Sequence, residues 1–230
     1  MKTWRKGTYN DEVWCPNRPV NISRAECLEL INEQAEWIAS SLSNLHSRAP
    51  TQATNLLSEI RLNRFRSLCA AFSNTMKEPL DNNKDEGLRI VCWAHLGSAT
   101  ELLLQIFLAI YIKDFKSTRF WDKPEIKEKL KKKSLPDLSL EPLKKFFKSE
   151  VWIKDKKNYW TNKIDKIQKN RNAIHSFKNR EIGSWGEIDE SLIDFAELLG
   201  DLIWQFPILP DKNSINKLKD VPPPSTYSVR

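Results

Sequence analysis

The segment 85–116 constrains the fold of this chain more than any other part of the sequence. It contains no proline, and apolar side chains occupy nearly every face when it is drawn as a helix. Its longest apolar run, 102–112, spans 11 residues and includes Gln105, whereas a membrane-crossing helix needs about 20. A helix that is apolar all round is buried inside a protein. We therefore expect 85–116 to be the central element of a helical fold.

Four further amphipathic patterns surround this central segment. The first begins at Ser23 and Glu26, which match a capping box, a motif in which the two side chains satisfy each other's backbone donors. Only 6 of the 230 residues are Gly, whereas average usage of about 7% would give about 16. We predict an all-α protein, a single bundle of about five long helices covering 23–45, 50–78, 85–116, 150–177 and 188–206.

The ends of the chain and one internal segment do not fit the helical pattern. Residues 1–22 read as an irregular N-terminal arm, and 207–230, with three consecutive prolines, as an extended tail. Between them lies a single helical domain, 23–206. Its segment 117–149 is rich in lysine and punctuated by prolines, so we interpret it as a surface insertion.

Positive charge is concentrated in one part of the sequence. The segment 113–180 has 21 Lys and Arg against 9 Asp and Glu, a net charge of +12, and the rest of the chain is at −5. A basic segment of this kind favours a polyanionic partner, through release of the counterions that the polyanion carries. The alternative is a solvated, lysine-rich helix surface without a ligand.

The four cysteines and the N-terminal residues indicate the compartment. Cys15, Cys27, Cys69 and Cys92 show no CxxC spacing and read as buried free thiols. The first fourteen residues are polar and mixed in charge, unlike a signal peptide. We expect a cytoplasmic protein that does not enter a membrane.

Several chemistries lack the residues that they need. His46, His95 and His175 are the three histidines, and none stands at metal-ligand spacing from another His or Cys. No GxGxxG, Walker A or GxSxG motif is present. We therefore expect neither a metal nor a cofactor. His95 falls on the apolar side of 85–116 and reads as a hydrogen-bonded core histidine.

The heptapeptide 171–177, RNAIHSF, carries the strongest functional signal. Residues four apart are neighbours on a helix, so Arg171 can bind a phosphate while His175, with a pKa near neutrality, exchanges a proton beside it. Arg171 continues an apolar series with the spacing of one helix face, where the pattern calls for an apolar residue. Glu101 lies close to the apolar face of 85–116 and needs a cationic partner, which makes a pair between Glu101 and Arg171 attractive.

These residues resemble a known family. A helix reading LGSATELLLQIFL, followed by RNAIHSF and a closing amphipathic helix, resembles the HEPN superfamily over residues 85–206, in its branch associated with defence and toxin systems. The resemblance implies a helical bundle that forms a homodimer, in which two Arg-Asn…His motifs face each other across a cleft. It also implies that Arg171, Asn172 and His175 are catalytic, and the expected pair with Arg171 gives Glu101 a supporting role.

The leading hypothesis is a metal-independent endoribonuclease of a bacterial defence or toxin–antitoxin system. RNA is then the substrate, and an antitoxin or another defence protein is a possible partner. The RNA-binding candidates are Lys131, Lys132, Lys133, Lys169 and Arg180. Only three residues separate Arg171 from His175, fewer than the four to six usual in the family. This spacing favours the alternative of a catalytically silent module that binds RNA, a nucleotide or a partner protein. A helical structural adaptor is the third hypothesis.

Overall fold

The computed structural model describes residues 22–43, 51–57, 59–76, 86–124, 126, 138–152, 156–172, 181–203 and 205–206. Within these ranges the regular structure is helical and includes no strand, which confirms the all-α prediction. In chain order the helices are α1 (Arg24–Ser43), α2 (Thr51–Leu56), α3 (Glu59–Thr75), α4 (Glu86–Ile110), α5 (Ile112–Lys116), α7 (Leu140–Phe146), the π-helical turn η3 (Phe147–Val151), α8 (Lys156–Arg171) and α9 (Trp185–Ile203). The predicted tail and nearly all of the predicted arm lie outside the described residues.

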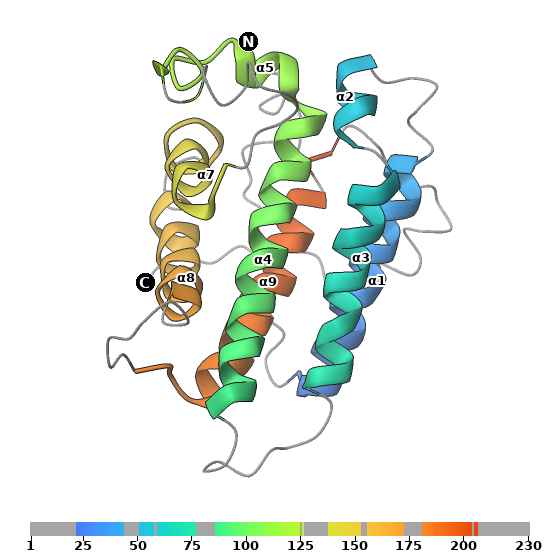
Figure 1. Ribbon diagram of the computed structural model, residues 1–230, viewed down its shortest axis with the longest axis vertical. Coiled ribbons are helices and arrows are strands. Elements are labelled where there is room, and N and C mark those ends of the chain that lie inside the picture. The colour runs from blue at the N-terminus through green and yellow to red at the C-terminus, as the bar shows by residue number, and fades with distance from the viewer. Residues whose placement is uncertain are drawn as a thin grey trace, which may run out of the picture.

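Helix α4 lies at the centre of the molecule. Figure 1 shows α9 behind it, α1 and α3 on one side, and α7 and α8 on the other. It contacts α3, α7, α8 and α9, and Trp93, Leu103 and Phe107 on it are fully buried. The predicted central role of 85–116 is therefore confirmed. The segment is interrupted at Tyr111, whose backbone angles (φ −101°, ψ 31°) leave the helical region and separate α4 from α5.

By length and composition α4 is also a helix that could cross a membrane. It has 25 residues, and 56% of its most apolar 18-residue window is buried inside the protein. The core helix of a globular protein gives the same signal, because its apolar side chains are covered by neighbouring helices.

Two helices begin at capping boxes. Before α1, the Ser23 amide donates to Glu26 Oε2 at 2.8 Å and the Glu26 amide to Ser23 Oγ at 3.3 Å, as predicted, and these hydrogen bonds lower the pKa of Glu26. Before α9, the Ser184 amide donates to Glu187 Oε2 at 2.7 Å, and the Glu187 amide to Ser184 Oγ at 3.2 Å. This second box starts α9 at Trp185, three residues earlier than predicted.

The described part of 117–149 differs from the predicted surface insertion. Leu140, Leu143, Phe146 and Phe147 are buried, and they belong to the same apolar cluster as the rest of the core. Pro142 is compatible with a helix here because it lies in the first turn of α7, where a backbone N–H has no partner within the helix. The proline pattern therefore predicted less regular structure than the described residues of this segment have.

Helix α8 begins later than predicted. Residues 147–151 continue α7 as the π-helical turn, and Trp152 is extended (ψ 136°), so a helix starting at 150 is wrong. The predicted helix 50–78 is likewise two elements, α2 and α3, and Arg61 Nη1 donates to the Leu56 carbonyl at 2.8 Å across their junction.

Three of the four cysteines are buried free thiols, as predicted, and Cys15 lies outside the described residues. Burial raises the pKa of Cys27 to about 12 and that of Cys92 to about 11. Burial also raises the pKa of Cys69. The nucleophilic form of cysteine is the thiolate, so these three side chains are unsuited to nucleophilic catalysis.

Candidate functional site

Glu101 and Arg171 form the ion pair that the sequence predicted. Arg171 Nη1 donates to Glu101 Oε2 at 2.7 Å, and their side chains are 27% and 22% exposed. The same carboxylate oxygen accepts the backbone amide of Leu140 at 2.9 Å. One atom of α4 therefore fixes both the last residue of α8 and the first residue of α7.

The aliphatic part of Arg171 lies directly on Gly97. A Cβ placed on Gly97 would lie 2.3 Å from Arg171 Cδ and 2.9 Å from Arg171 Cγ, closer than atoms in van der Waals contact. Glycine inside a helix costs about 1 kcal/mol relative to alanine. Gly97 thus has a packing function: it lets the arginine stem approach the α4 backbone on its way to Glu101.

Helix α4 also holds the segment that precedes α9. Arg89 Nη1 donates to the Gly183 carbonyl at 2.8 Å, and Trp93 Nε1 donates to the Ile182 carbonyl at 2.6 Å. Gly183 has φ +76°, a left-handed conformation that glycine adopts without strain. The chain after the heptapeptide is therefore anchored to α4, as is Arg171 at its beginning.

The anchoring residues of α4 are spaced four apart, and we call them the α4 ridge. A fifth member extends it, because Gln105 Nε2 donates to the Leu138 carbonyl at 3.1 Å. Residues at this spacing form a continuous ridge on a helix surface. The ridge consists of Arg89, Trp93, Gly97, Glu101 and Gln105.

A partly open cavity of about 290 Å³ lies beside Arg171. It is lined by residues from the start of α7 and the end of α8, namely Ser139, Leu140, Glu141, Gln168, Arg171 and Asn172. Because Glu101 holds both Leu140 and Arg171, α4 fixes the two walls of the cavity relative to each other.

Lys144 organises the acidic side of this cavity. Its ammonium group contacts Asp165, accompanied by Glu141 Oε2 at 2.7 Å and Gln168 Oε1 at 2.9 Å. Hydrogen bonds from Lys144 are the largest cause that lowers the pKa of Glu141 to about 2, and Lys145 and Gln168 add to the effect. Glu141 is therefore ionised at neutral pH.

The lysines of α8 form a ladder of ion pairs with acidic residues of α9. Lys166 contacts Glu190 Oε2 at 2.8 Å, and Lys163 contacts both Asp194 and Glu197, the latter at 3.1 Å. The third rung, Lys156 with Asp201, is nearer the other end of α9. Burial raises the pKa of Asp201. These α8 lysines pair with carboxylates inside the bundle, whereas the charge count had included them in a basic segment that favours a polyanionic partner.

The other sequence-predicted site residues divide into two groups. Asn172 lines the cavity and is exposed, and Lys169 is exposed on α8. The remaining candidates lie outside the described residues, so their assignment stays a prediction: His175, Lys131, Lys132, Lys133 and Arg180. The buried residues Trp160, Ile164 and Ile167 form the predicted apolar series that Arg171 continues.

His95 lies in the packing between α3 and α4, but it differs from the predicted hydrogen-bonded core histidine. Its ring meets Phe72 edge-on with centroids 6.3 Å apart, and its buried Nδ1 has no hydrogen-bond partner among the residues that the structure describes.

Sequence reasoning missed Ser139 and Gln168 as cavity residues, and it missed most of the α4 ridge. A signal was present for Gly97, since an isolated glycine in a strongly apolar helical pattern usually has a packing reason. The partners of Arg89 and Gln105 are backbone carbonyls, which leave no trace in side-chain patterns.

Fold and site together define an all-α protein with an arginine–glutamate pair beside a partly open cavity. Among the residues that the structure describes, no group of three or more His, Cys, Asp or Glu side chains could hold a metal ion. No family model, curated protein or solved structure matches the chain. Its function must therefore be argued from the residues of the site.

Proposed function

We propose that this chain is a HEPN-like, metal-independent endoribonuclease of a bacterial defence or toxin–antitoxin system. The observation that supports the proposal is the placement of Arg171. Its guanidinium group is fixed by Glu101 at the edge of a cavity, with Asn172 beside it. The arginine has five N–H donors, and the ion pair with Glu101 uses only Nη1, so others remain for a phosphate.

The chemistry needs one cation, one base and one acid. A base removes the proton of a ribose 2′-hydroxyl, and the 2′-oxygen attacks the adjacent phosphorus. The bond to the 5′-oxygen breaks, an acid protonates that oxygen, and a 2′,3′-cyclic phosphate remains. Arg171 stabilises the charge on the phosphoryl oxygens. In the proposed homodimer, the His175 side chains of two subunits share the roles of acid and base, and Asn172 supports the motif.

His175 is within reach of this site along the chain. Four residues span at most about 14 Å, so the Cα atom of His175 cannot lie farther than that from the Cα atom of Arg171. The anchoring of Ile182 and Gly183 on α4 restricts the chain from its other side. Both constraints support an assignment of His175 to the same site.

The second candidate is a catalytically silent module that binds RNA, a nucleotide or a partner protein. The observation that favours it is the direct ion pair of Arg171 with Glu101, which already neutralises part of the charge that a transition state would use. The short spacing between Arg171 and His175 points the same way.

Cleavage of labelled single-stranded RNA by the purified chain, with and without a chelator, separates the two candidates. We expect cleavage in both conditions, with 2′,3′-cyclic phosphate ends. His175→Ala should lower the rate by about 10²-fold or more, the usual size of a general acid–base contribution. His46→Ala is the matched control and should cleave like wild type. Binding without cleavage would refute the endoribonuclease and support the silent module, and a protein that neither binds nor cleaves RNA would refute both the endoribonuclease and an RNA-binding module.

A further inference from the structure

We propose that the cavity between α7 and α8 is the subsite for one nucleotide of the RNA and selects adenine or cytosine over uracil. This inference rests on the proposed RNA-binding function. It assigns a specificity role to Gln168 and Glu141, which lie outside the heptapeptide.

The size of the cavity fits a nucleotide better than a single ion. Its volume of about 290 Å³ lies just below the range typical of small-molecule pockets, about 300–1,000 Å³. A bound ion alone would leave most of this space to water. A ligand that fills the cavity would extend from Arg171 to the first turn of α7, because both line it.

The end of the cavity at Arg171 is suited to a phosphate. Arg171 retains N–H donors beyond the one that binds Glu101, and the exposed amide of Asn172 follows it. Ser139 precedes α7 at the N-cap position without the usual side-chain capping bond, so its hydroxyl is available to a ligand. Arginine forks and amide or hydroxyl donors are the usual partners of a phosphate group.

The other end presents a donor next to an acceptor. Gln168 Oε1 accepts from Lys144 at 2.9 Å, which orients the amide, and Gln168 contributes to the lowered pKa of Glu141. The amide nitrogen carries two hydrogens, and the Glu141 oxygens, which contact Lys144 and Lys145, keep further lone pairs. Gln168 precedes Arg171 by three residues, a rise of about 4.5 Å along the helix, which is on the scale of a ribose.

This pair selects the base. Glu141 has a pKa lowered to about 2, so its carboxylate accepts hydrogen bonds at neutral pH and repels a phosphate. Carboxylates accept from exocyclic amino groups of bases. Adenine and cytosine offer such an amino group beside a ring nitrogen that accepts, matching Glu141 and Gln168 together. Uracil has a carbonyl in place of the amino group and an N–H in place of the accepting ring nitrogen, so it mismatches both Glu141 and Gln168.

The walls are held in place before any ligand binds. Glu101 accepts the Leu140 amide, and Gln105 donates to the Leu138 carbonyl, so two residues of the α4 ridge fix the start of α7. A preformed site loses less entropy on binding than one that must be ordered.

The test measures binding of AMP, CMP, UMP and inorganic phosphate to the full chain by calorimetry, and it needs no cleavage. We expect AMP and CMP to bind at least about fivefold more tightly than UMP, the discrimination that one good base contact provides. Gln168→Met, which keeps the side-chain volume, should abolish this preference. Asn162→Ala, at an exposed amide of the same helix, is the control and should preserve it.

The outcomes separate this inference from the proposed function. Equal affinities for CMP and UMP, or a preference that survives in Gln168→Met, would overturn the nucleotide subsite, even if RNA is cleaved. A preference that Gln168→Met removes would support the subsite even if the chain cleaves no RNA. Unfolding temperatures of both variants are recorded first, so that unfolding is excluded as the cause of any loss of binding.

Discussion

The Oε2 atom of Glu101 accepts two hydrogen bonds from different helices, one from Arg171 and one from the Leu140 amide. The position of the arginine therefore depends on the docking of α7 as well as on α8. Because both side chains are about one quarter exposed, the pair lies between a surface salt bridge and a buried one in energy.

Replacement of Arg171 measures this energy. Arg171→Ala should lower the free energy of unfolding by about 1–2 kcal/mol, because Glu101 keeps the Leu140 amide as one partner and retains some solvent. Urea denaturation gives the value. Lys169→Ala, two residues away and exposed, should change it by less than about 0.5 kcal/mol. Equal effects of the two substitutions would contradict the assigned pair.

Gly97→Ala tests the close approach of the arginine stem to α4. In the wild-type background the new methyl group displaces Arg171 from Glu101, so we expect lower stability and weaker binding of RNA. In the Arg171→Ala background the contacts with Cδ and Cγ are removed and only the Cβ atom of residue 171, 3.1 Å away, stays close, so the same substitution should cost much less stability. A double-mutant cycle measures this difference. Additive effects would show that Gly97 does not serve Arg171.

Among the elements, α8 and α9 carry most of the paired charge. Lys163 lies between Asp194 and Glu197, and Tyr159 also donates to Glu197 Oε2 at 2.7 Å. The Glu197 side chain is only 2% exposed. Removing one of these partners should lower the free energy of unfolding, because a buried carboxylate that loses its cation is destabilising.

Lys163→Met should therefore be strongly destabilising. We expect a loss of about 3 kcal/mol in the free energy of unfolding, the lower end for a broken buried pair, because Tyr159 still bonds Glu197. Chemical denaturation measures the loss. Lys157→Met on the same helix, where the structure gives no ion pair, should cost much less. A similar cost for both variants would refute the ladder as a stabilising element.

The acidic side of the cavity makes stability depend on pH. Glu141 has a pKa of about 2 in the folded chain against 4.5 when unperturbed, so its contribution is complete above pH 4.5 and is lost as the pH falls toward 2. Glu141→Gln should flatten the unfolding temperature in that interval. Thermal unfolding from pH 6 to pH 2 checks this. An unchanged profile would show that other carboxylates govern acid unfolding.

The central helix, the Ser23 capping box and the Glu101–Arg171 pair were predictable because each has a local or periodic signature. The start of α8 was not, because Phe147, Val151 and Trp152 are apolar residues that a helix or a π-helical turn buries equally well. The α4 ridge escaped prediction because its partners include backbone carbonyls far away in sequence. Charge counting failed on α8 because it ignores the acids of α9.

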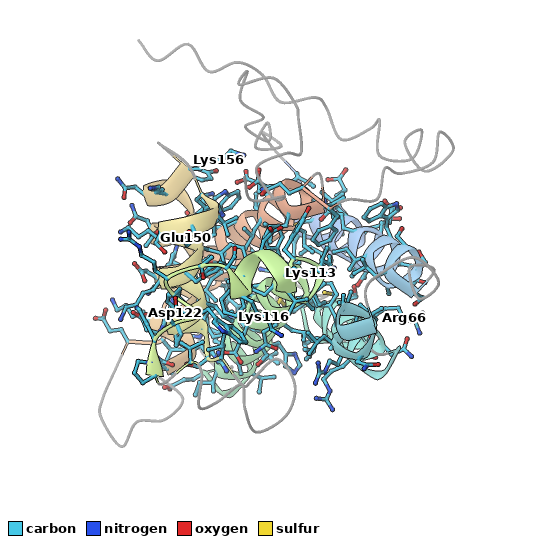
Figure 2. The ribbon with its side chains drawn as sticks, turned by 90° about the horizontal axis from the view of Figure 1, so that it is seen from above. Arg66, Lys113, Lys116, Asp122, Glu150 and Lys156 are labelled. Atoms are coloured by element: carbon cyan, nitrogen blue, oxygen red, sulfur yellow. The ribbon has the colours of Figure 1, made fainter. Side chains whose placement is uncertain are left out.

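On the scale of the whole molecule, the net charge of +12 over 113–180 is partly compensated inside the bundle. Among the described residues of this segment, at least six cations contact a carboxylate: Lys144, Lys145, Lys156, Lys163, Lys166 and Arg171. At the α5 end, Figure 2 shows Lys113 and Lys116 with the acidic residues Asp122 and Glu150 on the same face. The described surface there mixes both signs, which places more weight on the predicted role of Lys131, Lys132 and Lys133.

Salt dependence of RNA binding distinguishes paired from available cations. Each phosphate contact contributes about −0.7 to the slope of log K against log salt for single strands. Replacing Lys131, Lys132 and Lys133 with alanine should reduce the magnitude of the slope by about 2. Lys166→Ala, which removes a cation paired with Glu190, should change it little. Equal changes would mean that the α8 ladder opens to bind RNA.

The α4 ridge fixes the distance between the points at which the central helix holds the neighbouring chain. Trp93 donates to the chain after the heptapeptide and Glu101 binds Arg171 at its first residue, so the eight-residue spacing of these two residues on α4 sets the separation of the two attachment points. One residue inserted between them would rotate the following part of α4 by 100° and advance it by 1.5 Å. Trp93 and Glu101 could then no longer face their partners at the same time. Length changes that preserve the site are therefore confined to the segments outside 89–105.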